Sequence, residues 1–139
     1  MHISLATTDR QIEECSTVLG QLRVHLDQKH LFQQIKNQID CGYQLVRITV
    51  DDSVVAVAGF RMSQSLAWGH FLYVDDLVTR DDKRSQGYGH ALIEWLVSYA
   101  KTNQCDQLHL DSGVRRTDAH RFYENNRFVK TSCHFSMAL

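Results

Sequence analysis

The hydrophobic pattern of this chain changes its period on either side of one short turn, Arg84-Ser85-Gln86-Gly87-Tyr88-Gly89. Residues 68–79, just before the turn, are rich in aromatic and branched side chains and predict a long strand. From residue 88 to residue 100, apolar side chains recur at helical spacing, and Gln107–Leu110 then predicts a second, short strand. A strand, a helix and a strand in this order predict a parallel strand pair joined by a right-handed crossover.

The N-terminal third of the chain predicts two helices that must pack on a sheet. A short strand is expected at residues 2–6, and two amphipathic helices follow it. Thr8 or Asp9 caps the first helix, and Gly42 stands in the usual position just past the end of the second. The apolar positions that define their buried faces are Ile12, Cys15, Val18, Leu19, Leu22, Leu31, Phe32, Ile35 and Ile39.

The middle of the chain predicts an antiparallel meander. Residues 43–50 and 54–62 are β-branched and aromatic, and the polar segment Asp51-Asp52-Ser53 between them predicts a hairpin turn. Gly59 is expected to be a bulge or a site of close approach. With residues 68–79 as the third strand, three strands follow one another in the sheet.

The C-terminal residues predict a last helix at 118–126 and a closing strand at 128–137. A chain of 139 residues is long enough for one hydrophobic core. We therefore expect a single α/β (α+β) domain over residues 1–139, with a mixed, mostly antiparallel central sheet flanked by helices.

Composition narrows the classes of partner. The formal net charge of −1 gives no global field that favours nucleic acid or an anionic membrane. No stretch approaches the roughly 18 apolar residues of a membrane helix, and the N-terminus does not read as a signal peptide. The four cysteines form no C-x-x-C pair, so the sequence lacks the spacing that is typical of zinc ligands. We expect a cytoplasmic protein with no metal, whose cysteines are reduced and mostly lie in the core.

The turn between the long strand and the helix predicts an anion-binding site. The first amides of a helix have no intrahelical acceptor, and the helix dipole adds positive charge there. Gly87 and Gly89 leave room for phosphate oxygens to approach the backbone, and Arg84 adds a cation, which together suit a pyrophosphate. A glycine pair near a helix start, without a flanking strand, would more often be a plain turn. The segment Arg84–Gly89 also lacks the third glycine of the dinucleotide fingerprint and the G-K-[ST] of the nucleotide-triphosphate loop.

A strand followed by R-x-x-G-x-G and a helix resembles the coenzyme-binding motif of the Gcn5-related N-acetyltransferase (GNAT) superfamily. Leu108-His109-Leu110 is similar to the strand that follows in that family, and Ala119 to Glu124, with Phe128, is similar to its A-x-x-x-Y-E-x-x-G-F helix. The resemblance is specific from Tyr73 to Phe128. The chain departs from the motif at Arg127, where the family has glycine, so Asn126 is expected to take the turn conformation.

The resemblance implies acetyl-CoA as co-substrate and a splayed parallel strand pair that receives its pantetheine arm. Backbone groups at the edge of the strand before the turn would pair with the arm, and the amides of the turn would bind the pyrophosphate. A second departure, Arg116 where the family often has asparagine, would serve a phosphate. The implied cofactor-binding residues are Leu77, Val78, Thr79, Arg84, Ser85, Gln86, Gly87, Tyr88, Gly89, His90 and Arg116.

The resemblance also implies a catalytic acid. Acyl transfer to an amine needs a neutral amine, stabilisation of an oxyanion and a proton for the leaving thiolate. Tyr123 aligns with the family's general-acid tyrosine, and a phenol of pKa near 10 stays protonated at neutral pH. The alternative for Tyr123 is a core tyrosine beside Phe122.

The catalytic base is expected at Asp75 or Asp76, where related enzymes often place an acidic residue. Strand alternation sends the two side chains to opposite faces, and we favour Asp75 for the active-site face, although a bulge would reverse this assignment. Either carboxylate could instead bind a cationic substrate and leave deprotonation to a water chain. His120 and His134 compete as bases, but structural roles are more typical for them.

The leading hypothesis is an acetyl-CoA-dependent N-acetyltransferase that acts on a primary amine of a small molecule or protein. The acidic pair fits a polyamine, amino-sugar or lysine-like acceptor, and a homodimer is expected only by analogy. An alternative is a coenzyme-binding sensor of the same fold without turnover. A nucleic-acid binder using Arg115, Arg116, Arg121 and Arg127 is disfavoured by the net charge.

Overall fold

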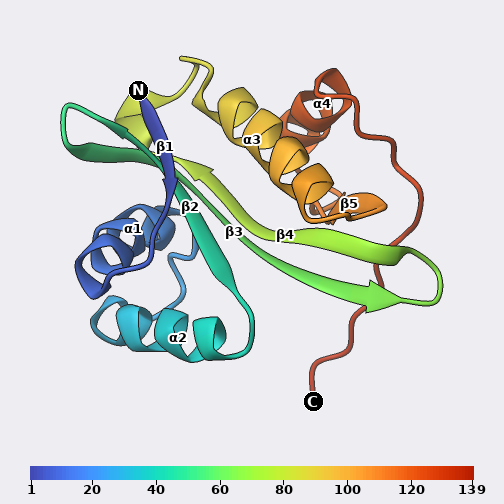
Figure 1. The fold of residues 1–139 in the computed structure, drawn as a ribbon, viewed down its shortest axis with the longest axis horizontal. Coiled ribbons are helices and arrows are strands. Elements are labelled where there is room, and N and C mark those ends of the chain that lie inside the picture. Colours follow the sequence, from blue (N-terminus) through green and yellow to red (C-terminus); the bar gives the residue numbers. More distant parts are fainter. The chain divides into compact units, whose positions relative to one another are not determined.

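The computed structural model describes all residues from Met1 to Leu139 (Figure 1). It divides into an N-terminal unit, Met1–His109, and a C-terminal unit, Leu110–Leu139, and each unit is described by itself. A single domain over residues 1–139 therefore stays a prediction. No helix is both long and apolar enough to cross a membrane.

A five-stranded sheet forms the centre of the fold, with its strands side by side in the order in which they occur along the chain. The neighbours from β1 to β4 pair antiparallel, and β4 and β5 run parallel. The predicted meander, the parallel pair and the mixed, mostly antiparallel sheet are thus confirmed. The strands are β1 (His2–Leu5), β2 (Gln44–Val50), β3 (Ser53–Ser65), β4 (Gly69–Thr79) and β5 (Gln107–Leu110).

Helices α1 (Asp9–Leu22) and α2 (Gln28–Asp40) cover one face of the sheet (Figure 1). Thr8 caps α1 by accepting from the Gln11 amide, and the Gln11 side chain accepts from the Thr8 amide in return. Past the end of α2, Gly42 has a φ of 101°, a conformation that glycine adopts without strain. The buried residues shared by this face are Ile12, Cys15, Val18, Leu19, Leu31, Ile35, Tyr43, Leu45, Val57 and Val78.

Helix α3 (Tyr88–Thr102) lies on the other face (Figure 1). Phe60 of β3 is fully buried there, with ring centroids 6.2 Å from Trp95 and 5.4 Å from Tyr99. Burial of an aromatic side chain contributes about 2–3 kcal/mol to stability. The turn before α3 connects this helix to the end of β4, so the packing of α3 on the sheet fixes the position of the turn.

A β-bulge interrupts the pairing of β3 with β4. Gly59 pairs with Asp76, but the next residue, Phe60, pairs with Val74, so Asp75 is an extra residue on β4. Cross-strand partners share a face of the sheet. Val74 therefore lies with Phe60 on the α3 face, whereas Val78 packs with the core under α1 and α2.

Gly59 is a site of close approach, one of the two alternatives expected for it, and it lies beside the bulge, whose extra residue is on β4. The register shifts beside it, and a Cβ atom at this position would overlap the hydroxyl of the buried Tyr43. The glycine therefore leaves the space in which the Tyr43 phenol reaches β4.

The C-terminal unit contains helix α4 (Thr117–Asn125). Arg127 ends the helix with a φ of 70°, while Phe128 N–H donates to Tyr123 O and Arg127 N–H to Glu124 O, both at 3.0 Å. This is the double hydrogen bond of a Schellman motif. The expectation that Asn126 takes the left-handed conformation is wrong, because Asn126 (φ −95°) is the last residue before the reversal.

The predicted closing strand over residues 128–137 is also wrong. Residues 129–139 are exposed and form no helix or strand. An alternating pattern selects which side chains share a face, but the backbone amides and carbonyls of a strand also need a neighbouring strand.

Three of the four cysteines lie outside the core, which corrects the expectation of mostly buried thiols. Only Cys15 is buried, and its burial raises the pKa of the thiol to about 12. Cys41 and Cys133 are exposed, and Cys105 is half-buried. Apart from Cys15, their polar neighbours in sequence fit surface positions better than core positions.

Candidate functional site

The turn before α3 has the backbone of an anion-binding site. Ser85 has a φ of 61° and Gly87 a φ of 85°, two left-handed residues on either side of Gln86. The first backbone hydrogen bond of α3 runs from Ala91 N–H to Gly87 O at 3.0 Å. The amides of Tyr88 and Gly89 precede that bond and have no intrahelical acceptor. Successive amides in such a turn form a concave nest for an anion, so these residues fit a pyrophosphate.

Arg84 supplies the expected cation at the turn. Its side chain is 65% exposed, and Nη2 lies 2.6 Å from Asp81 Oδ1. An exposed ion pair of this kind is worth little and exchanges readily. The guanidinium can therefore turn to a bound phosphate without a large loss.

The edge of β4 that leads into the turn extends beyond its neighbour β5. Asp106 N–H donates to His70 O at 2.7 Å, which fixes the start of β5 beside the start of β4. Since β5 has only four residues, it runs beside the beginning of β4 and not beside Leu77–Thr79. On the β3 side, Val78 pairs with Val57 and Thr79 with Ala56. Backbone N–H and C=O groups of Leu77–Thr79 on the edge of β4 opposite β3 can pair with an extended ligand.

The bulge sends both acidic side chains of β4 to the α1 and α2 face. Asp76 accepts from the Tyr43 hydroxyl at 2.6 Å and from Arg23 Nε at 2.9 Å. Asp75 accepts from Arg61 Nε at 2.9 Å and Nη2 at 3.1 Å. Arg61 shares a face with Gly59 and Val57, two and four residues earlier on β3. The expectation that the two carboxylates face opposite ways is wrong, because the extra residue of the bulge cancels the alternation.

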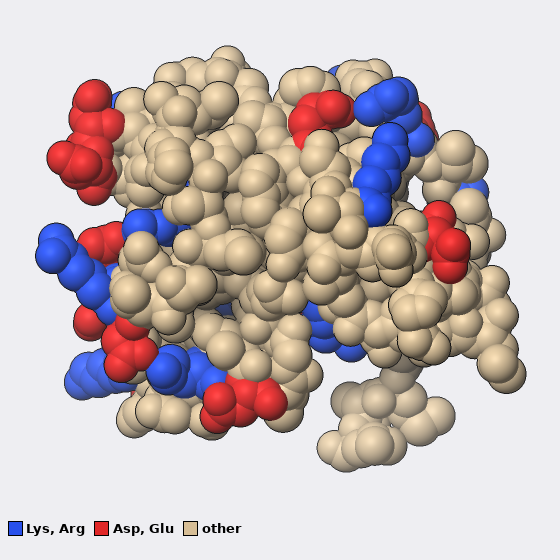
Figure 2. All heavy atoms as spheres, in the orientation of Figure 1, with Lys and Arg blue, Asp and Glu red and all other residues tan.

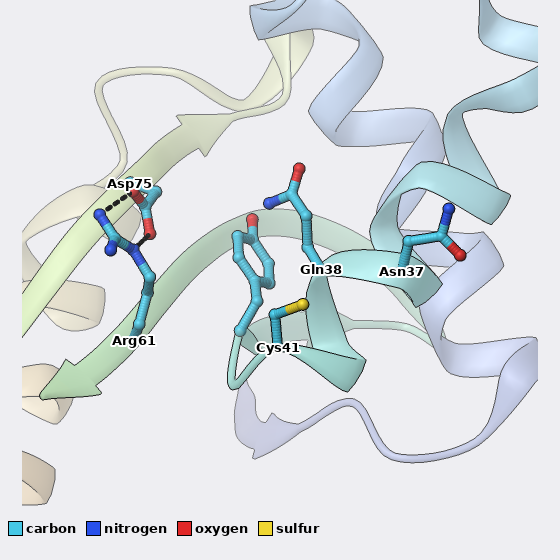
Figure 3. A pocket seen from close by; sticks show the side chains of 6 residues that line it. Asn37, Gln38, Cys41, Arg61 and Asp75 are labelled. Carbon is cyan, nitrogen blue, oxygen red and sulfur yellow. Dashed lines mark hydrogen bonds and ion pairs between the residues drawn. The ribbon is translucent and has the colours of Figure 1, made fainter.

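A cavity of about 400 Å³ lies beside the bulge. Asp75 reaches it from β4 and Arg61 from β3, and the end of α2 supplies the remaining wall (Figure 3). Figure 3 shows the Arg61–Asp75 pair on one side of the cavity and Gln38 and Cys41 on the other. The full lining is Asn37, Gln38, Cys41, Tyr43, Arg61 and Asp75.

Sequence reasoning found only Asp75 among these residues. The signal for Tyr43 and Arg61 was Gly59, since a glycine inside a strand marks a close approach and the same-face neighbour two residues on is Arg61. Nothing in the pattern of α2 distinguishes Asn37, Gln38 and Cys41 from other residues of its exposed face.

The buried Tyr43 phenol is held neutral by its surroundings. Burial, followed by the negative charge of Asp76, raises the pKa of Tyr43 well above its usual range. The hydroxyl therefore acts as a fixed hydrogen-bond donor to Asp76. Asp76 does not line the cavity, whereas Asp75 does.

Tyr123 and Arg116 belong to the C-terminal unit. The ring of Tyr123 lies 5.4 Å from that of Phe122 and 5.8 Å from that of Phe128, measured between centroids. Burial raises the pKa of Tyr123, and the charge of Arg116 partly opposes this. The phenol is thus protonated at neutral pH, as a proton donor must be. The roles of both residues at the turn and the bulge stay predictions.

The competing histidines have local partners. His120 Nε2 lies 2.7 Å from Gly113 O, and His134 Nδ1 lies 3.5 Å from Asp111 Oδ1. Both contacts are within the C-terminal unit and favour structural roles. No group of three or more His, Cys, Asp and Glu side chains is placed to hold a metal ion.

Charged side chains on the visible face gather along the left edge and at the upper right, and both signs occur in each place (Figure 2). Lysines and arginines lie next to aspartates and glutamates instead of forming a separate basic field on this face. This face therefore gives no support to an electrostatic nucleic-acid interface.

Comparison with known proteins adds independent information. The family model described as "Acetyltransferase (GNAT) family" matches residues 11–128 and so spans both units. An uncharacterised N-acetyltransferase, YhdJ of Bacillus subtilis (strain 168), is 29% identical over 124 residues, which are 88% of this chain and 87% of that protein.

Solved structures share the fold at low sequence identity. A putative acetyltransferase from Agrobacterium tumefaciens (str. C58) superposes with a TM-score of 0.85 at 19% identity, covering 100% of both chains. A ribosomal-protein-alanine N-acetyltransferase from Brucella melitensis biovar Abortus 2308 superposes with a TM-score of 0.84 at 18% identity, again over 100% of both chains.

Proposed function

This chain belongs to the acetyltransferase (GNAT) family, and on that premise we propose that it is an acetyl-CoA-dependent N-acetyltransferase. Its acceptor is a primary amine of a small molecule or protein. The observation that carries the proposal is the turn before α3, where left-handed residues at Ser85 and Gly87 precede helix amides without intrahelical acceptors.

Acetyl-CoA supplies the acetyl group as an activated thioester. The amides from Gln86 to His90 bind its pyrophosphate, assisted by the positive end of the α3 dipole. Arg84 and Arg116 add cations for the phosphates. The backbone of Leu77–Thr79 binds the extended pantetheine arm, since that stretch of β4 lies beyond the end of β5.

The acceptor amine binds in the cavity beside the bulge and must lose a proton before it attacks. We assign this proton to Asp75, directly or through a water, because Asp75 lines the cavity. Asp76 is a positioning residue, because its carboxylate is held by Tyr43 and Arg23. Tyr123 holds the proton for the leaving sulfur, and the raised pKa of its phenol keeps that proton available.

Two measurements test the proposal. Acetyl-CoA is expected to raise the melting temperature in a concentration-dependent manner, because a ligand that binds only the native state stabilises it. Release of free thiol is then measured across a panel of primary amines. Stabilisation without thiol release from any amine would favour the sensor alternative, and no stabilisation at millimolar acetyl-CoA would refute the assignment of the turn.

A further inference from the structure

We infer that the cavity beside the bulge selects an amine that also carries a carboxylate, as a free amino acid does, and that Arg61 binds this carboxylate. The inference rests on the proposed function and narrows its acceptor to small zwitterions. It replaces the expectation, drawn from the acidic pair alone, of a polyamine, amino-sugar or lysine-like acceptor.

The charges around the cavity argue against a polycation. Asp75 is already paired with Arg61 through two hydrogen bonds of 2.9 and 3.1 Å. Asp76 is paired with Arg23 at 2.9 Å and also accepts from Tyr43. Each carboxylate thus has its own arginine, and the site presents no excess negative charge to a diamine or a longer polyamine.

Arg61 keeps hydrogen-bonding capacity for a ligand. The N–H of Nε and one N–H of Nη2 donate to Asp75, which leaves three of the five N–H groups, including both of Nη1. The guanidinium carbon lies 5.1 Å from the centroid of the Tyr73 ring, so the side chain is held on that ring as well as by Asp75. At 51% exposed, it is accessible from the cavity. A fixed, accessible guanidinium with free N–H groups is a suitable partner for a carboxylate.

The opposite charge of a zwitterion also finds a partner here. An ammonium group next to the ligand's carboxylate would meet Asp75, so the ligand would lie antiparallel to the Arg61–Asp75 pair. Gln38 and Cys41, at the C-terminal end of α2, line the same cavity, and this end of a helix carries a partial negative charge. The ligand's amine would then lie next to the proposed proton acceptor.

Size and neutral groups complete the selection. A cavity of about 400 Å³ is at the lower end of the range for small-molecule sites. The amide side chain of Gln38 adds neutral hydrogen-bonding groups to its wall. This lining suits a compact polar molecule better than a long flexible amine.

The test uses matched pairs of acceptors that differ only in the carboxylate, each amino acid being compared with its decarboxylated amine. Suitable pairs are leucine with isoamylamine, phenylalanine with phenethylamine, and lysine with cadaverine. Thiol release from acetyl-CoA gives kcat/KM for each. We expect at least one pair in which the amino acid exceeds its amine by about tenfold or more, the usual effect of a charge-assisted hydrogen bond.

Variants of two arginines assign the effect. Arg61→Met should bring the amino acid to amine ratio of kcat/KM close to one, and Arg61→Lys should retain part of the preference. Arg10→Met is the matched control, because Arg10 also pairs with a carboxylate, Glu14, but is 89% exposed on α1 and does not line the cavity. The melting temperature and acetyl-CoA affinity of each variant show whether it is folded.

The outcomes separate this inference from the proposed function. If acetyl-CoA binds and the decarboxylated amines or polyamines react as well as the amino acids, the inference is refuted while acetyl transfer stands. A preference for amino acids that persists in folded Arg61→Met also refutes the role of Arg61. If acetyl-CoA does not bind, the proposed function itself fails. The inference is upheld by a preference that is present in the native protein and in Arg10→Met and is lost in Arg61→Met.

Discussion

The turn before α3 and the bulge on β4 are built by different means. At the turn, the donors are backbone amides, and the side chains matter mainly because Gly87 permits a φ of 85°. At the bulge, the donors and acceptors are side chains from four places in the chain: Arg23 just past α1, Tyr43 just before β2, Arg61 of β3 and Asp76 of β4. The first region is local in sequence, and the second spans 53 residues between Arg23 and Asp76.

This difference in construction suits two different functions, coenzyme binding at the turn and acceptor selection at the bulge. A backbone site tolerates changes in its side chains and suits a coenzyme that many related proteins share. A site made of side chains changes its specificity when one residue is replaced, which suits an acceptor that differs among relatives. Substitutions at the turn should therefore act on coenzyme affinity, and substitutions around the bulge on stability and acceptor choice.

Tyr123→Phe should have the largest effect and should leave both regions intact. Removing the hydroxyl removes the proposed proton donor, and positioned acids contribute about 100-fold or more to turnover. We expect kcat to fall by about 100-fold while the dissociation constant of acetyl-CoA, measured by calorimetry, stays within about twofold. Full activity would leave Tyr123 as a core residue, and a large loss of coenzyme affinity would place it in binding instead.

Gly59→Ala tests the close approach on which the bulge region depends. The added methyl group would overlap the Tyr43 hydroxyl, and overpacking of a buried contact costs about 2 kcal/mol of unfolding free energy. Gly20→Ala is the matched control, because its methyl group would meet only the flexible end of the Gln28 side chain. In the last turn of α1 this replacement should be neutral or stabilise by up to about 1 kcal/mol.

Urea denaturation measures both glycine variants. If Gly59→Ala were no less stable than Gly20→Ala, Tyr43 would not approach β4 at this point, and its contact with Asp76 would have to be abandoned.

The same contrast explains what could be predicted from the sequence. The turn was found because glycines, a flanking strand and a helix start lie within a few residues of one another. Gly59 indicates a bulge or a close approach, but the sequence does not show that the extra residue is Asp75 on β4. That position follows from the pairing of Gly59 with Asp76 and Phe60 with Val74, which no local pattern encodes. The two aspartates are predicted to face opposite ways, but both lie on the α1 and α2 face, and Asp75 as the active-site residue stays a prediction.

The sequence predicts whether a segment is a helix or a strand better than it predicts which other segments it pairs with or packs on. The helices from Asp9 and from Tyr88 and the strand Gln107–Leu110 were predicted because period and capping are local properties. The tail at 129–139 was mistaken for a strand because its composition cannot show whether a neighbouring strand is present. The sequence does not identify the cavity residues Asn37 and Gln38 for a similar reason, since only the packing of α2 on the sheet brings them to the cavity.

Gly87→Ala should weaken acetyl-CoA binding by about tenfold, or about 1.4 kcal/mol. The methyl group would stand where phosphate oxygens approach the amides, and it would strain the left-handed backbone. Gly42→Ala is the control for strain alone, because Gly42 also has a positive φ, of 101°, and open space around it.

Both variants should lose about 1 kcal/mol of stability from the backbone, but only Gly87→Ala should lose affinity. Calorimetric titration distinguishes the two effects. Equal affinities for acetyl-CoA in the two variants would mean that the turn before α3 does not contact the coenzyme.

Tyr43→Phe should have the smallest effect on function, none on coenzyme affinity, and should lower the free energy of unfolding by about 1.5 kcal/mol, as for a hydrogen bond to a charged group. It deletes one hydrogen bond to Asp76, whose carboxylate keeps its ion pair with Arg23. Tyr99→Phe is the matched control, because its hydroxyl donates to the neutral Gln44 side chain at 3.2 Å and should be worth less. Since the Tyr43 contact is local to the bulge, acetyl-CoA affinity should not change. A variant that is as stable as the parent protein but binds the coenzyme less tightly would show that the two regions are coupled, and the division of work between backbone and side chains would then be wrong.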